Sequence, residues 1–387
     1  MKIGKLPLMN RISEQIAVMP AVGWLPGDTG VQEHFRCMTF KQYMNFCLYD
    51  NQHGYYRSGS VRVGKQGDFY TSSAVGSVLA HCLSNVLRSY ANDVAQGSIR
   101  LMEWGAGTGR LSKQIQDSWK IHLNRSPGYK CLPVLVDDHP GHLEEAKRSF
   151  SADDPTCKPL FLASEEAMHK KELWQGTPTV VLANELLDAF PVHRVTVWTG
   201  RLVELGVAGN AEEGFYEVYM PISDERIPLS LQRDGITLVE GQRTEVNLEA
   251  EQWLGRLGEI MASGRVLIID YGHEAKEYTA EHRMNGTLLC YSEHRASDTP
   301  YIRIGEQDIT AHVPFTSLKH AAEVSGWRIT YYDTQKQFLM DYGAFELLQN
   351  HGETDPFGEK ARINRAVRQL LLSDGMSEAF KVLILDK

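Results

Sequence analysis

The chain has 387 residues, of which 42% are hydrophobic and 23% charged, so it is long enough for one large core or two domains. Its formal net charge of −9, with no Lys/Arg-rich run, disfavours a broad nucleic-acid interface. No uninterrupted apolar run approaches the roughly 20 residues that span a membrane. Six cysteines without a Cys-x-x-Cys pair indicate isolated thiols in a reducing compartment, not a disulfide framework or a zinc site.

The N-terminal residues carry few targeting signals. Lys2, Lys5 and Arg11 are present, but no apolar core or cleavage site follows them, so a secretory signal is not expected. The sequence leaves a transit peptide open, although Glu14 and the shortage of basic residues argue against one. We therefore expect a cytoplasmic protein, or one of the mitochondrial matrix if the source is eukaryotic.

Helix patterns come first along the chain, and strand patterns follow. Thr39 and Gln42 form a capping-box pattern at the start of a helix, and a second helical pattern covers residues 74–90. From residue 99 onward strands and helices alternate, which predicts a parallel sheet covered by helices. The expected strands lie at 100–104, 132–136, 161–162, 180–183, 266–270, 327–333 and 380–385, with a helix at 315–325.

Residues 191–250 interrupt this alternation. Two apolar segments at 193–198 and 201–207 flank Thr199-Gly200, which predicts a β-hairpin. With further strands expected at 215–220 and 237–239, the segment reads as a β-rich insertion. The expected organisation is an N-terminal helical or lid segment at 1–95, a main domain at 96–340 that contains the insertion, a helical cap at 341–379 and a last strand at 380–387.

A glycine-rich segment between the first expected strand of the sheet and its helix is the main candidate for a ligand site. Glu103 is followed by Gly105, Gly107 and Gly109, and glycines allow bare backbone to approach a nucleotide-like ligand. A dinucleotide-binding fingerprint requires glycine at the sixth position from Gly105, where this chain has Arg110. The pattern instead resembles the first motif of S-adenosylmethionine (SAM) methyltransferases, with a structural glycine turn or another nucleotide site as the alternatives.

Polar residues follow the next expected strand. Asp137 lies 30 residues after Gly107 (137 − 107), a separation that suits an acid accepting hydrogen bonds from a ribose. The alternative for Asp137 is a solvated strand end. His139 and His142 are spaced as metal ligands on one helix face, but Pro140-Gly141 favours a polar turn, and we expect no metal.

Another polar group follows the strand at 180–183. Asn184 and Glu185 come directly after it, at the sheet edge where open α/β proteins bind ligands, and Asp188 follows. On a helix Glu185 and Asp188 face one side and suit a guanidinium, whose planar fork matches carboxylates. The alternative is a helix N-terminus, capped by Asn184 and stabilised by the two acids.

These and other segments together resemble the MidA-like SAM-dependent methyltransferases, relatives of a mitochondrial complex I assembly factor that methylates protein arginine. The most specific matches are Gly-Asp-Phe-Tyr-Thr-Ser at 67–72, Asn-Glu-Leu-Leu-Asp-Ala-Phe-Pro at 184–191 and Asp-Ile-Thr-Ala-His-Val at 308–313. Matching segments also lie at 40–49, 54–56, 240–246, 269–272, 286–295 and 380–383. The resemblance implies a Rossmann-like, seven-stranded class I methyltransferase sheet with an N-terminal helical segment, the β-rich insertion and the C-terminal helical cap.

The resemblance also implies site residues. The expected SAM-binding residues are Asp68, Thr71, Ser72, Glu103, Gly105, Ala106, Gly107, Asp137 and Asn184, and the expected acceptor-side residues are Glu185, Asp188 and His312. The chain departs from the family where Asp137 replaces the usual Glu and where Ser73-Ala74 replaces the usual Pro-Glu. These departures indicate a divergent branch and weaken transfer of the acceptor more than transfer of the chemistry.

The sequence therefore predicts a SAM-dependent methyltransferase acting on a protein, with arginine the favoured acceptor. Two alternatives stay open: methylation of a small molecule, and a non-catalytic assembly module that binds SAM. The expected partner is a protein, with no nucleic acid and no membrane span, and the sequence leaves a homodimer open.

Overall fold

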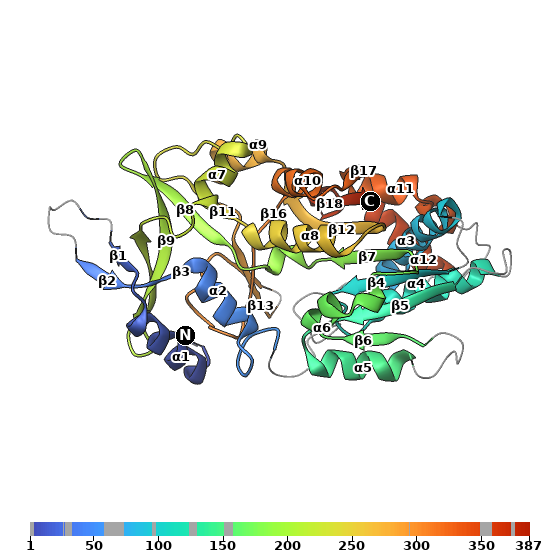
Figure 1. The fold of residues 1–387 in the computed structure, drawn as a ribbon, viewed down its shortest axis with the longest axis horizontal. Coiled ribbons are helices and arrows are strands. Elements are labelled where there is room, and N and C mark those ends of the chain that lie inside the picture. Colours follow the sequence, from blue (N-terminus) through green and yellow to red (C-terminus); the bar gives the residue numbers. More distant parts are fainter. Residues whose placement is uncertain are drawn as a thin grey trace. The chain divides into compact units, whose positions relative to one another are not determined.

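The structure is a computed structural model that describes residues 4–25, 27, 33–57, 73–94, 98–123, 130–150, 158–293, 295–348, 358–372 and 376–387. Its contacts divide the chain into two compact units (Figure 1). The α/β unit consists of Val61–Leu186, Gly255–Tyr271 and Ala322–Lys387, and the β-rich unit of Met1–Ser60, Leu187–Leu254 and Gly272–Ala321. No helix in the described ranges is long and apolar enough to cross a membrane.

One sheet forms the centre of the α/β unit. Its order is β17 (Arg328–Thr334), β18 (Phe380–Asp386), β12 (Arg265–His273), β7 (Thr179–Asn184), β4 (Ser98–Trp104), β5 (Lys130–Val136) and β6 (Leu160–Leu162). The strands from β6 to β12 run parallel, as the alternating pattern predicts, and β18 is antiparallel to both of its neighbours. Because β16 (Val313–Pro314) pairs with the end of β12, the described sheet has eight strands where the sequence predicts seven.

Helices bury the apolar strands of this unit. Helix α3 (Ser73–Asp93) packs against α4 (Arg110–Leu123) and α12 (Glu359–Leu372), and their apolar residues share a core with β4, β7, β12 and β18. Helix α5 (Pro140–Phe150) covers β5 through Ala146. The remaining helices are α6 (Ser164–His169), η1 (Lys171–Leu173), α11 (Gln335–Asp341), η4 (Ala344–Leu347) and α13 (Met376–Ala379). Helices α8 (Leu248–Ile260) and α10 (Phe315–Val324) have residues in both units.

The β-rich unit has a second sheet and a small third one. The larger follows the order β11 (Arg243–Val246), β8 (His193–Trp198), β9 (Arg201–Asn210), β10 (Gly214–Met220), β1 (Val22–Trp24) and β2 (His34–Arg36), with β3 (Met38–Thr39) beside β9. The smaller has the order β14 (Arg295–Ser297), β13 (Leu289–Ser292) and β15 (Asp308–Thr310). The helices are α1 (Leu6–Val18), α2 (Phe40–Tyr49), η2 (Leu187–Ala189), α7 (Arg226–Arg233), α9 (Ala275–Tyr278) and η3 (Glu281–Arg283).

The local signals in this unit gave mixed results. The hairpin at Thr199-Gly200 is confirmed, with positive φ at both residues, and Thr39 and Gln42 form the expected capping box. The strand expected at 237–239 is wrong, because this segment is irregular and Leu238 packs into an apolar cluster without a strand partner. The more polar β11 pairs with β8 instead.

The compact units divide the chain differently from the segments expected from the sequence. Residues 1–60 join the insertion, since β1 and β2 extend its sheet from β10. Helix α3, which the sequence places in the N-terminal segment, packs instead in the α/β unit. The pairing of β1 with β10 and the packing of α3 on α12 both join residues that are far apart in the sequence. No local sequence pattern therefore predicts either of them.

Candidate functional site

The glycine segment forms a tight loop between β4 and α4 in the α/β unit. Gly105, Gly107 and Gly109 have φ values of +73°, +54° and +72°, in the left-handed region that favours glycine. A Cβ on Gly105 would lie 2.9 Å from Leu186 Cδ1, and one on Gly109 would lie 2.3 Å from Leu135 Cδ2. Gly105 and Gly109 are therefore needed for both conformation and space, and Gly107 for conformation.

Asp137 lies against this loop, so the structure brings the two predicted elements together. Gly107 N donates to Asp137 Oδ2 at 2.8 Å, and His139 N donates to Asp137 Oδ1 at 2.8 Å. The Nδ1 atom of His142 lies 3.3 Å from Asp137 Oδ1, and the rings of His139 and His142 stack 4.3 Å apart. In the described ranges no three His, Cys, Asp or Glu residues come together to hold a metal ion.

Replacing Asp137 with alanine is expected to weaken SAM binding by about 1.5–3 kcal/mol, the usual worth of a hydrogen bond to a charged group. Calorimetric titration of the purified protein with SAM measures this loss. Asp138→Ala is the matched control, because Asp138 accepts from Ser164 N instead of the glycine loop. Equal affinity in the Asp137 variant and the parent would show that Asp137 does not hold the cofactor.

Glu103 is buried beneath the loop, with 5% of its surface exposed. Ser112 donates to Glu103 Oε2 from its backbone N at 3.1 Å and from its hydroxyl. Burial raises the pKa of the Glu103 carboxyl to about 7, although the Ser112 bonds favour the charged form. Sequence reasoning missed Ser112, whose place in the first turn of α4 gives it no motif signal. The role of Glu103 toward the cofactor stays a prediction.

The segment after β7 does not form the α-helix that would place Glu185 and Asp188 on one face. Glu185 is an exposed residue with φ +51°, and its N donates to Ile269 O at 2.9 Å, continuing the ladder to β12. Asp188 lies in the short 3-10 helix η2, across the boundary between the two units. A left-handed non-glycine residue is strained and occurs often at functional sites. The helical-face argument for this pair is therefore wrong, while the individual roles stay predictions.

Asp270 holds the strained turn. It is fully buried, its Oδ2 accepts from Leu186 N at 3.2 Å, and its Oδ1 accepts from Tyr271 N at 2.9 Å. Leu186 in turn packs against Gly105. Asp270 thereby links the Glu185 turn to the glycine loop within one unit. Sequence analysis placed Asp270 in a family segment but missed this role, because both bonds depend on strand pairing.

Asp188 lies beside the segment that carries His312 in the β-rich unit. Asp188 is 5% exposed, and its backbone O accepts from the N of Ala311, the residue before His312, at 2.9 Å. The Tyr56 hydroxyl contacts both carboxylate oxygens of Asp308 at 2.7 Å. Burial, and then the charges of Asp308 and Asp188, raise the pKa of Tyr56 well above its usual value. The surroundings of Asp188 therefore combine a second carboxylate with a tyrosine.

The backbone around His312 is fixed on both sides. His312 N donates to Thr287 Oγ1 at 3.2 Å, and His312 O accepts from the Tyr278 hydroxyl at 2.9 Å. The rings of His312 and His273 lie 5.0 Å apart. Burial, followed by the nearby His273 and Arg283, lowers the pKa of His312 to about 4. His312 is therefore neutral near pH 7, and its burial disfavours the protonated form.

This depressed pKa predicts a pH-dependent stability. Between pH 6.5, the usual value, and about pH 4, the unfolded chain binds a proton that folded His312 does not, so stability falls as the pH falls. The loss reaches about 3 kcal/mol at pH 4. Urea unfolding of the parent and His312→Gln at pH 7 and pH 5 measures it, with the exposed His169→Gln as control. Parallel pH dependence in the parent and His312→Gln would contradict the prediction.

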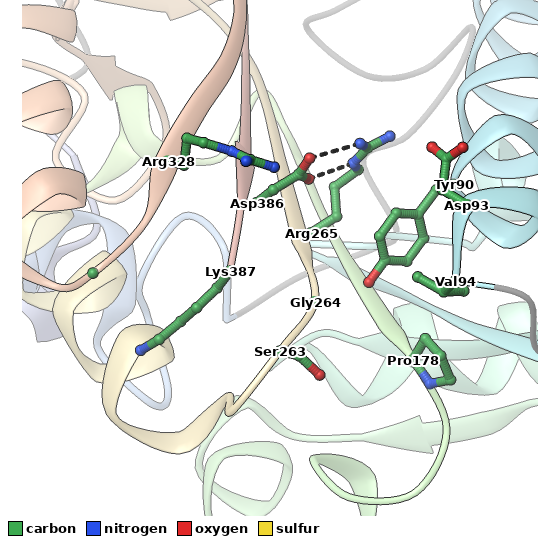
Figure 2. A pocket seen from close by; sticks show the side chains of 11 residues that line it. Tyr90, Asp93, Val94, Pro178, Ser263, Gly264, Arg265, Arg328, Asp386 and Lys387 are labelled. Carbon is green, nitrogen blue, oxygen red and sulfur yellow. Dashed lines mark hydrogen bonds and ion pairs between the residues drawn. The ribbon is translucent and has the colours of Figure 1, made fainter.

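A pocket of about 720 Å³ in the α/β unit lies away from these residues (Figure 2). It is lined by Pro178 before β7 and by Arg265 and Arg328 at the starts of β12 and β17, whereas the glycine loop follows the end of β4. Figure 2 shows Arg265 between Asp386, bonded at 2.6 and 2.8 Å, and the Tyr90 ring, 4.7 Å from the guanidinium carbon. The most buried charges of this pocket, Arg265 and Asp386, form an ion pair with each other. We therefore assign this pocket a structural role, at the edge of the sheet where the parallel strands begin.

Three predicted residues of the cofactor site, Asp68, Thr71 and Ser72, lie outside the described residues. Their expected place beside the cofactor stays a prediction.

Comparison with known proteins supports the interpretation of the glycine loop as part of a SAM-binding site. Residues 78–332 match the family described as "Putative S-adenosyl-L-methionine-dependent methyltransferase". A crystal structure of a superfamily member from Burkholderia thailandensis bound to S-adenosyl-homocysteine is 27% identical, with a TM-score of 0.82 over 98% of this chain and 92% of that one.

Curated relatives extend the comparison to named activities. The chain is 26% identical to the mitochondrial protein arginine methyltransferase NDUFAF7 homolog of Drosophila melanogaster over 304 residues, 74% of this chain and 66% of that protein. It is 23% identical to the mitochondrial protein arginine methyltransferase NDUFAF7 of Danio rerio over 88% of this chain and 81% of that protein. The chain thus spans just under two thirds of the fly protein. The mitochondrial names give no support to the cytoplasmic location expected from the sequence.

Proposed function

The chain belongs to this family of SAM-dependent methyltransferases, and from that premise we propose that it transfers a methyl group from SAM to an arginine side chain of a protein. The observation that carries the proposal is the left-handed glycine loop bonded to Asp137, since this loop offers backbone and a carboxylate to one ligand. The arginine acceptor is supported by the names of the relatives and by the carboxylates at Glu185 and Asp188.

In this proposal the α/β unit holds the cofactor. The backbone of Gly105, Ala106 and Gly107 approaches its methionine end with Glu103 beneath, and Asp137 accepts from the ribose hydroxyls. Asn184 lies at the end of β7, and Asp68, Thr71 and Ser72 close over the ligand. When bound, SAM supplies a methyl group on a positively charged sulfonium. Holding donor and acceptor in line accounts for about 7–11 kcal/mol of barrier reduction at its best.

The acceptor-side residues are proposed to orient a guanidinium. The exposed Glu185 carboxylate accepts its N–H groups, because a planar guanidinium pairs with a carboxylate through two parallel bonds. Asp188 and His312 are further candidates for the acceptor side. Methylation with bound SAM would release one proton from the acceptor nitrogen, and this proton would leave to solvent, because the lowered pKa of His312 makes it a weak base.

The cell compartment follows from the relatives under the same proposal. We place the protein in the mitochondrial matrix if its source is eukaryotic; the support is that both relatives are named as mitochondrial proteins.

The test is methylation in a proteome extract by the purified chain with methyl-labelled SAM. Label is expected in protein, and hydrolysis followed by mass spectrometry is expected to show methylarginine. Label in small molecules alone would favour the small-molecule alternative and overturn the arginine proposal. A chain that binds SAM without consuming it would be a non-catalytic module. A methylarginine mark that disappears on deletion of this chain would identify the acceptor.

A further inference from the structure

The short turn that carries Asp188 depends on other segments for its conformation. Helix η2 contains Leu187, Asp188 and Ala189, and its bond from Phe190 N to Leu187 O is 3.3 Å long. A three-residue 3-10 helix with so long a bond has little stability by itself. The direction of the Asp188 side chain is therefore set by the contacts that other segments make with this turn.

Two segments of the β-rich unit hold the first two carbonyls of the turn. Asn247, the residue before α8, donates from Nδ2 to Leu187 O at 2.9 Å. Ala311, the residue after β15, donates from its backbone N to Asp188 O at 2.9 Å. Neither bond can be removed cleanly by substitution, because Ala311 uses its backbone and Asn247 also accepts from Ala250 N in α8.

A tyrosine at the end of α2 holds the third carbonyl. The Tyr49 hydroxyl donates to Ala189 O at 3.0 Å. The Tyr49 ring stacks on the Tyr56 ring with centroids 5.7 Å apart, and the Tyr56 hydroxyl contacts both carboxylate oxygens of Asp308 at 2.7 Å. Asp308 is buried in β15, so this contact fixes the Tyr56 ring in the interior of the unit. Tyr49 is thereby held both at its hydroxyl and along its ring.

The Tyr49 hydroxyl stays protonated and remains a donor at neutral pH. Burial, and then the charges of Asp308 and Asp188, raise the pKa of Tyr49 well above its usual value. Burial, and then the same two carboxylates, also raise the pKa of Tyr56 and the pKa of Tyr291. The Asp188 carboxylate therefore lies close to this group of tyrosines.

We propose that Tyr49 is a positioning residue for methyl transfer. Its bond to Ala189 O fixes the direction of the Asp188 carboxylate. The contact between Tyr56 and Asp308 keeps the Tyr49 ring in place. The inference rests on the proposed role of Asp188 on the acceptor side, and Tyr49 acts through Asp188 without touching the acceptor.

The test compares Tyr49→Phe with Tyr43→Phe in the full chain. Each variant removes a hydroxyl of α2 that donates to a backbone carbonyl at 3.0 Å, but the carbonyl that Tyr43 holds belongs to Pro300. Transfer of total label from methyl-labelled SAM is measured in a proteome extract from cells that lack this chain. Tyr49→Phe is expected to lower kcat/KM for the acceptor about 10- to 100-fold with an unchanged Kd for SAM, because a slightly misplaced group costs up to about 10² in rate. Tyr43→Phe is expected to match the parent, and equal rates in the two variants would overturn the proposal.

Hydrogen exchange reads the position of the turn independently of activity. Because Ala311 N donates to Asp188 O, Tyr49→Phe is expected to speed exchange of the Ala311 amide about fivefold, as measured by NMR, while Tyr43→Phe leaves it unchanged. Unchanged exchange at Ala311 would overturn the proposal even where transfer has fallen. Faster exchange with unchanged transfer would overturn it as well, because the direction of Asp188 would then not matter.

A third variant tests the contact between Tyr56 and Asp308. Tyr56→Phe is expected to lower transfer less than Tyr49→Phe, and the double variant is expected to match Tyr49→Phe within about twofold, because both changes act through one bond. Fully additive losses would show that Tyr56 acts by another route. Label found outside arginine would contradict the proposed function and leave the role of Tyr49 intact, so the two failures are distinguishable.

Discussion

Glu185→Ala is expected to reduce methyl transfer by on the order of 10² to 10³-fold while leaving the Kd for SAM unchanged. The physical reason is that Glu185 is exposed and offers its carboxylate to the acceptor, while the cofactor contacts proposed for the loop come from other residues. Its backbone conformation is fixed by Ile269 O and by the neighbouring Leu186–Asp270 bond, so the truncation removes a side chain and leaves the turn in place.

Turnover with labelled SAM and calorimetric SAM binding, measured on the same preparation, check this separation. Glu165→Ala is the matched control, because Glu165 is an exposed acid of the same unit in helix α6. Gly107→Arg marks the opposite behaviour, since an arginine on the loop should abolish SAM binding. If Glu185→Ala loses SAM as completely as Gly107→Arg does, Glu185 belongs to the cofactor site and its acceptor role is wrong.

Gly109→Ala is expected to destabilise the α/β unit by about 2–5 kcal/mol. A left-handed conformation costs an alanine roughly 1–2 kcal/mol, and overpacking of a core costs about 1–3 kcal/mol. Both apply here, because Gly109 has φ +72° and the new Cβ would lie 2.3 Å from Leu135 Cδ2 and 3.3 Å from Ala146 Cβ. Denaturant unfolding followed by circular dichroism measures the change.

Gly176→Ala separates the two contributions. Gly176 has φ +79° in the same unit, and its added Cβ would meet nothing within 4 Å, so only the conformational cost remains, about 1–2 kcal/mol. The Gly109 variant should therefore be the less stable of the two. Equal stability would mean that Leu135 and Ala146 move aside and that the loop is not tightly packed.

The elements that sequence analysis predicted correctly have local causes. Strand β4, the glycine loop and helix α4 follow from an apolar run, residues that adopt positive φ and a helical apolar period, all within residues 98–123. The sequence analysis also placed Asp137 at the same site as the loop, and the structure has the two in contact, because neighbouring parallel strands bring their carboxyl ends to one edge. The sequence alone therefore predicted that the glycine loop and Asp137 lie at the same edge of the sheet.

The elements that it missed depend on distant partners. Glu185 does not enter a helix, because its N–H pairs with β12 and Asp270 captures the next amide from 84 residues away. Strand β11 is polar and therefore gave a weak strand signal, yet it pairs with β8, and Arg194 of β8 lies 3.3 Å from Glu245 of β11. No local pattern encodes such pairs, so neither the turn nor this strand could be derived from spacing alone.

The discontinuous make-up of the two units has a consequence during synthesis on the ribosome. Strand β7 ends at Asn184, but its neighbour β12 begins at Arg265, after most of the β-rich unit has been translated. At about 5–20 residues per second, roughly 4–16 s pass before that neighbour is made. During this interval the apolar edge of β7 has no partner on that side. Nascent chains stalled between these two strands should therefore bind chaperones more strongly than chains released after β18.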